Sequence, residues 1–142
     1  MSHFLTFVIV DAEGTDAARR AREMLTPYFA PDGLYSSDNP SAKFDGCVIG
    51  GRFDGQLRGA EPMYNLTPAE FQRRYGFDVL KDEDNISVAS EVPAGLTPYA
   101  VVTPVGEWLD CENKDAAAWK SEVKRLLRLH ADHLVVAVDC HC

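Results

Sequence analysis

The chain is organised around residues 44–55, which read Phe44-Asp45-Gly46-Cys47-Val48-Ile49-Gly50-Gly51-Arg52-Phe53-Asp54-Gly55. Four glycines enclose a short apolar run in this segment. Because glycine weakens the interior of a strand, such a density predicts unusual backbone angles or a close approach to another element. Arg52 follows the glycine pair directly, and its guanidinium is suited to pair with a carboxylate or a phosphate.

Two apolar runs lie near the ends of the chain, at residues 4–10 and 134–138. Both are apolar at successive positions and rich in β-branched residues, which is typical of strands that are covered on both faces. We therefore predict that these two strands are neighbours in the interior of one sheet.

Helical periodicity is present from residue 16 to about residue 29 and from residue 116 to about residue 130. Pro27 should disturb the last turn of the first helix. Either Asp115 or Asn113 is expected to cap the second helix at its N-terminus.

The middle of the chain predicts further short elements. Residues 99–103 and 107–109 flank a turn and should form a hairpin. Residues 53–57 should form a strand that returns from the glycine-rich segment, with Cys47 as a small buried hydrophobe. A helix is expected at residues 67–75 and an edge strand at residues 86–88.

These elements describe a single α+β domain over residues 1–142, with a variable insertion around residues 60–95. The sheet is expected to be mixed or antiparallel, with two main helices packed on it. A ferredoxin-like or related split arrangement fits the order of the elements.

Composition restricts the function classes. The 142 residues carry a formal net charge of -8, which argues against a broad surface for nucleic acid or anionic membranes. No apolar stretch approaches the roughly 20 residues of a membrane helix. The first residues do not resemble a secretory signal, and the four cysteines lack the spacing of a disulfide framework, so we expect reduced thiols and a cytoplasmic location.

Candidate site residues occur in two places. Asp45 and Arg52 could form an anion clamp for a phosphate or nucleotide, or a structural salt bridge that fixes the glycine bend. Asp139 and His141 fall on one side of an extended strand, so the aspartate could orient the histidine as a general base. The alternative is an exposed terminal pair, or a histidine packed under the Trp108 hairpin.

We further predict that residues 44–54, the Trp108 hairpin and residues 139–141 converge on one face. Phe53 and Trp108 should form an aromatic wall around Arg52. The cysteines lack the paired spacing of a zinc site, so no metal is expected. No cofactor is expected either, because the chain lacks the phosphate-loop and dinucleotide glycine patterns.

Three blocks of this sequence, at residues 39–53, 102–108 and 136–141, resemble a family of small uncharacterised proteins common in phages and bacterial genomes. Its patterns are close to N-P-x-x-K-W-D-x-x-x-I-G-G-R-W, T-P-D-G-E-W and a terminal V-V-D-C-H. Phe44 and Phe53 stand where that pattern has tryptophan, and Val105 stands where it has aspartate. The resemblance implies a phage or mobile-element setting but no activity.

Three function classes remain. We expect foremost a small soluble accessory protein of a phage or mobile element, which binds a host or phage protein and sequesters or blocks it, as in counter-defence. A small enzyme that acts on a phosphorylated or nucleotide substrate through Arg52, Asp139 and His141 is the second class. A structural component of a complex is the third. Direct binding to nucleic acid and to membranes is not expected.

Overall fold

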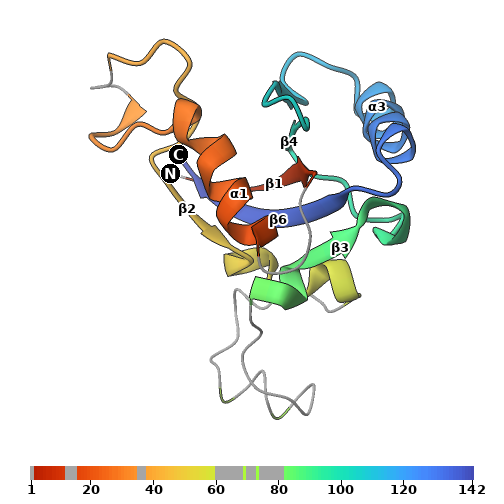
Figure 1. The fold of residues 1–142 in the computed structure, drawn as a ribbon. Helices are drawn as coiled ribbons and strands as arrows, with labels where there is room; N and C mark the ends of the chain where they lie inside the picture. The colour runs from red at the N-terminus through yellow and green to blue at the C-terminus, as the bar shows by residue number, and fades with distance from the viewer. Residues whose placement is uncertain (1, 12–15, 35–37, 60–68, 70–72, 74–81) are drawn as a thin grey trace.

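The two terminal strands pair along their whole length at the centre of a mixed sheet (Figure 1). The computed structural model describes residues 2–11, 16–34, 38–59, 69, 73 and 82–142. Strand β1 (His3–Val10) runs antiparallel to β6 (Leu134–His141), with eight residue pairs from His3 opposite His141 to Val10 opposite Leu134. The predicted adjacency of the terminal strands is therefore confirmed.

The other strands extend this central pair on both sides. On the β1 side, β4 (Ala100–Val102) pairs in parallel with β1, and β5 (Trp108–Asp110) pairs antiparallel with β4. On the β6 side, β2 (Gly46–Ile49) and β3 (Ile86–Val88) pair antiparallel with opposite halves of β6. The predicted hairpin and the predicted strand at residues 86–88 are confirmed.

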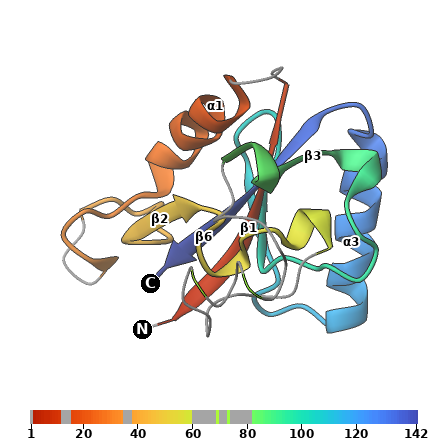
Figure 2. The same ribbon diagram turned by 90° about the horizontal axis from the view of Figure 1, so that it is seen from below.

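Two α-helices cover opposite faces of the sheet, α1 (Asp16–Leu25) on one and α3 (Ala116–Leu129) on the other (Figures 1 and 2). Side chains of a strand alternate between faces, so each terminal strand supplies both cores. The α3 core contains Leu5, Phe7, Ile9, Val135, Ala137, Trp119, Val123 and Leu126. The α1 core contains Val8, Val10, Val136, Val138, Ala17, Ala21, Met24 and Leu25.

The helix ends follow the sequence signals. The carboxylate of Asp115 caps α3 by accepting the N–H of Ala118 at 3.2 Å. Pro27 lies in a 3-10 turn, η1 (Thr26–Tyr28), which follows α1. Other 3-10 turns are η3 (Gly51–Phe53), η4 (Gln56–Arg58), η5 (Asp82–Asn85) and η6 (Ala89–Glu91).

Three expectations need correction or are left unconfirmed. The strand predicted at residues 53–57 is wrong: η3 and η4 occupy it, and β2 pairs with β6 instead of a returning strand. Cys47 is exposed, because β2 lies at the edge of the sheet. The ferredoxin-like arrangement is not confirmed, since β1 and β4 are parallel and the helices cover opposite faces.

The helix predicted at residues 67–75 lies outside the described residues except for Ala69 and Arg73, which are helical. In the part of the chain that the structure describes, no helix has both the length and the apolar character needed to span a bilayer. The α+β class with a mixed sheet and helices packed on it is established.

The first prediction tests the central strand pair. Val136 is fully buried in β6, so Val136→Asp places an unpaired charge in the core and should lower the free energy of unfolding by at least about 3 kcal/mol. Val105→Asp is the matched control, because Val105 is 89% exposed, and it should change stability by less than about 0.5 kcal/mol. Urea denaturation measures both; equal effects would contradict the buried position of Val136.

Candidate functional site

Two histidines meet at the end of the central strand pair. His3 of β1 is the register partner of His141 of β6, so both rings project from the same face of adjacent strands. Their ring centroids are 4.9 Å apart, with the planes inclined at 68°. The antiparallel register therefore brings the two ends of the chain together as a pair of imidazoles.

Each imidazole is held by its own carboxylate. His3 Nδ1 lies 2.8 Å from Asp139 Oδ1, and His141 Nδ1 lies 2.7 Å from Asp45 Oδ1. Because a carboxylate accepts, each Nδ1 carries the proton, and each Nε2 is left to exchange protons with a ligand. Neither Nε2 has a partner within the described residues. We call His3, Asp45, Asp139 and His141 the His–Asp cluster.

The cluster is reachable from solvent, although one of its acids is buried. The side chains of His3 and His141 are 30% and 27% exposed, and that of Asp45 is 29% exposed. Asp139 is only 3% exposed, so its two oxygens depend on protein donors. The cluster thus combines two partly exposed imidazoles with one buried carboxylate.

Gly51, the second residue of the glycine pair, lies against Asp139. Asp139 Oδ2 accepts the backbone N–H of Arg52 at 2.9 Å. A Cβ atom at Gly51 would lie 2.5 Å from that same oxygen, and Gly51 has a positive φ of 53°. Only glycine therefore lets the backbone come close enough to bond the buried carboxylate. The expected close approach of the glycine-rich segment is confirmed.

Buried hydrogen bonds from Asn85 fix the backbone of the glycine-rich segment after Gly51. Asn85 Nδ2 donates to Asp54 Oδ1 at 2.6 Å, and Asn85 Oδ1 accepts the N–H of Gly55 at 3.0 Å. Gly50 packs against both side chains, because a Cβ there would lie 2.5 Å from Asp54 Oδ1. Burial raises the pKa of Asp54, and the Asn85 hydrogen bond partly offsets this effect. These contacts join η3 and η4 to η5.

Arg52 contacts the His–Asp cluster through its backbone N–H, which bonds Asp139. Its side chain is exposed, and across the described ranges its guanidinium forms no ion pair with Asp45 or Asp139. The expected structural salt bridge between Asp45 and Arg52 is therefore wrong: the side-chain partner of Asp45 is His141. The anion clamp stays a prediction.

A cavity of about 420 Å³ opens beside His3. Its wall is aromatic, from Phe4, Tyr99 and Trp108, and Lys43 adds a cation. Two carboxylates, Asp110 and Glu112, also line it, but Asp110 already accepts the Trp108 Nε1–H at 2.9 Å. The volume is within the range of small-molecule sites.

The predicted aromatic wall of Phe53 and Trp108 is not formed. Phe53 packs against the α3 core, whereas Trp108 packs against the α1 core on the other face of the sheet. The alternation of side chains along β5 turns Trp108 away from Arg52. Trp108 instead contributes to the cavity next to His3.

The structure brings together Asp45, Asp139 and His141, but with different pairing. Asp139 binds His3, and Asp45 takes the role that we assigned to Asp139 toward His141. His3 was missed because the sequence at residue 3 shows only a polar residue at the start of a strand. The one available signal was that an antiparallel register of the terminal strands would place it opposite His141. Over the described ranges, no group of three or more His, Cys, Asp or Glu side chains forms a metal site.

Comparisons with known protein families, with curated proteins and with solved structures returned no match to this chain. The resemblance of the three sequence blocks to a phage-associated family thus stays a prediction.

Replacing Gly51 tests the close approach to Asp139. Gly51→Ala adds both a clash with Asp139 and the strain of a positive φ, so it should lower stability by about 2–4 kcal/mol. Gly59→Ala is the control, because Gly59 also has a positive φ, of 82°, but no atom of a described residue within 4 Å of its Cβ position. It should cost only about 1 kcal/mol. Thermal unfolding compares them, and a Gly59 effect as large as that of Gly51 would refute the contact.

The raised pKa of Asp54 should make the stability of the protein depend on pH. Its raised pKa means that the folded state holds this proton more tightly than the unfolded state. The contribution of Asp54 to stability is therefore greatest below the ordinary carboxyl pKa of about 4 and falls as pH rises through the raised value. Asp54→Asn removes this titration, so the stability of the variant relative to the parent should improve from pH 4 to pH 7. Urea denaturation across this range measures it; a difference that does not change with pH would contradict the assignment.

Proposed function

We propose that the His–Asp cluster performs general acid–base catalysis on a phosphoric ester. The observation that carries the proposal is the pair of imidazoles 4.9 Å apart, each bonded at Nδ1 to a separate carboxylate and each with Nε2 unpartnered in the described structure. A carboxylate on Nδ1 fixes the orientation and tautomer of a catalytic histidine. Two such histidines can serve one reaction as base and acid.

The two rings take complementary roles. The neutral imidazole accepts a proton at Nε2 from the attacking water while the water oxygen forms a bond to phosphorus. The protonated imidazole donates its Nε2 proton to the leaving oxygen as the second P–O bond breaks. A phosphodiester and water thus give a phosphomonoester and an alcohol, and the protonation states of the two rings are exchanged.

The surroundings support an anionic substrate with an aromatic part. The backbone N–H of Arg52 bonds Asp139, and its exposed guanidinium, which forms no ion pair within the described residues, suits a phosphate oxygen. The cavity next to His3 offers Lys43 and the rings of Tyr99 and Trp108. A nucleoside or another aromatic alcohol would fit this wall, with its phosphate toward His3, which lines the same cavity.

The function in binding a partner protein, which the composition favours, would use a different part of the molecule. Nothing in the His–Asp cluster requires a protein partner, and a role in sequestering a host component stays a prediction. Its physical support is a basic groove along α3, on the face of the sheet opposite α1. Catalysis and partner binding are compatible because they use different surfaces.

Activity against phosphodiesters tests the proposal. The protein should hydrolyse at least one member of a panel of dinucleoside monophosphates and bis(4-nitrophenyl) phosphate, followed by ³¹P NMR. His141→Gln and His3→Gln should each lower kcat by about 100-fold or more, since each removes one proton carrier. A bell-shaped dependence of the rate on pH is expected, because the reaction needs one ring neutral and the other protonated.

His133→Gln is the matched control. His133 also bonds an aspartate, Asp132, at 3.3 Å, but it precedes β6 at the end remote from His141. This variant should retain full activity. No turnover of any diester by the parent protein, or equal rates in the His141→Gln and His133→Gln variants, would overturn the proposal.

A further inference from the structure

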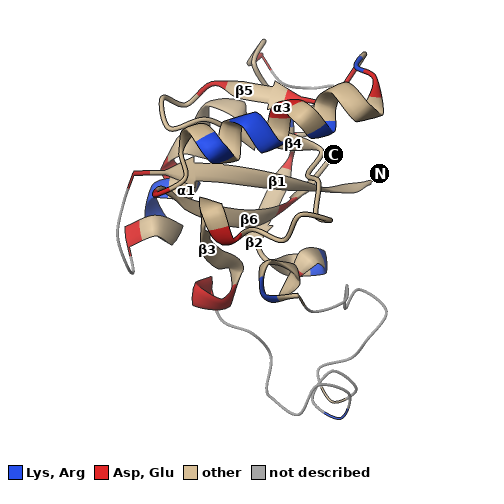
Figure 3. Ribbon diagram, turned by 90° about the vertical axis from the view of Figure 1, so that its right-hand side faces the viewer, with Lys and Arg blue, Asp and Glu red and all other residues tan. Residues whose placement is uncertain are grey.

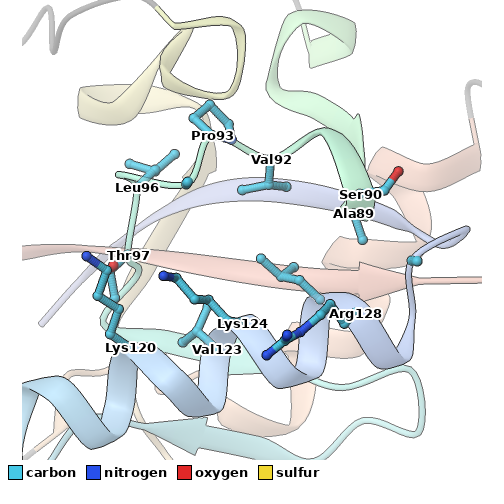
Figure 4. Close-up of a pocket in the computed structure, with 13 residues that line it drawn as sticks. Ala89, Ser90, Val92, Pro93, Leu96, Thr97, Lys120, Val123, Lys124 and Arg128 are labelled. Carbon is cyan, nitrogen blue, oxygen red and sulfur yellow. The ribbon is translucent and has the colours of Figure 1, made fainter.

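A groove of about 340 Å³ runs between α3 and residues 89–97 (Figure 4). One wall is apolar and comes from the loop after β3, with Val92, Pro93 and Leu96. The helix supplies Val123 and Leu127 to the floor. The groove follows α3 from Lys120 to the residue after its C-terminal cap, Ala131, a length of about 16 Å or three helical turns.

A row of cations forms the other wall. Lys120, Lys124 and Arg128 follow each other at four-residue intervals on α3, and Figure 4 shows their side chains side by side along the groove. At a rise of 1.5 Å per residue, successive cations are about 6 Å apart along the helix. In Figure 3 parts of the same helix are blue, the colour of Lys and Arg.

This local charge is opposite to that of the molecule. The chain has 22 acidic and 14 basic residues, yet the described residues that line the groove include three cations and no carboxylate. None of the three cations forms an ion pair with another described residue. A row of unpaired cations beside apolar side chains offers both charge and hydrophobic contact to a ligand.

Charge and shape distinguish between the classes of ligand. Three cations neutralise few phosphates, and the lining residues that the structure describes include no aromatic ring on which a base could stack, which disfavours nucleic acid. The net charge of -8 and the concave shape disfavour an anionic membrane, which contacts a broad convex basic surface. A short protein segment bound in the groove would interact mainly with charges within a Debye length of about 8 Å, because salt screens the more distant acidic residues.

We propose that this groove binds an acidic amphipathic helix of a partner protein. Carboxylates at four-residue intervals on that helix would lie opposite Lys120, Lys124 and Arg128. Apolar side chains on the adjoining stripe would enter the space between Leu96 and Leu127. An apolar face laid into a groove, with matched charges at its edge, is a recurring mode of peptide recognition.

A labelled peptide tests the groove directly. The probe is a fluorescein-labelled, 15-residue helical peptide with glutamates at positions i, i+4 and i+8 and leucines on the adjoining stripe. Fluorescence anisotropy should show saturable binding that weakens with added salt. A peptide with lysines in place of the glutamates should not bind. Lys124→Glu should weaken binding of the acidic peptide by about tenfold, because an attractive pair becomes a repulsive one.

Two further variants separate this groove from general electrostatics. Arg125→Glu makes the same kind of charge reversal on the next, exposed residue of α3, which does not line the groove, and should leave binding within about twofold. Ala94→Trp fills the groove from an exposed position without a change of charge, and it should weaken binding. The proposal would be overturned by equal losses in Lys124→Glu and Arg125→Glu, or by unchanged binding in Ala94→Trp. It would also be overturned if the protein associated more strongly with phosphatidylserine vesicles, or with a second copy of the chain, than with the peptide.

Discussion

The register between β1 and β6 is the constraint on which the rest of the structure depends. Eight consecutive residue pairs join the two strands, and both faces of the pair are buried under helices. A slip of one residue would exchange every side chain between the two cores, so the apolar pattern fixes the register strongly. The same register then sets His3 opposite His141 and places Asp139 where it can bond the first ring. The core thereby determines the geometry of a surface site.

The glycine-rich segment adapts to this central pair. β2 pairs with β6, which places Asp45 within hydrogen-bond distance of His141. After β2 the glycines turn the backbone, so that the N–H of Arg52 bonds Asp139. The turn would be blocked by a side chain at Gly51 and is secured by the buried contact of Asp54 with Asn85. The segment thus supplies one acid of the cluster and supports the other. Its unusual composition reflects contacts with β6 and η5, with no strand returning from it.

The sequence predicted the parts of the fold that depend on local pattern. The terminal strands, the capped helix at Asp115 and the β4–β5 hairpin each follow from periodicity and turn residues. The sequence did not predict the register between the terminal strands, since the pairing of residues from opposite ends of the chain leaves no local pattern. For that reason Asp45, Asp139 and His141 were identified as candidates, while their pairing and the role of His3 were not.

The most direct test of this account is the tautomer of the two site histidines. Long-range ¹H–¹⁵N correlation spectra of the parent protein report which ring nitrogen carries the proton, with His3→Gln and His141→Gln for assignment. Because each Nδ1 donates to a carboxylate, both neutral rings should be Nδ1–H tautomers, the minor form of free imidazole in histidine. An Nε2–H tautomer at either ring would contradict the account, because that Nδ1 would have no proton to donate and its Nε2 would not be free to accept one.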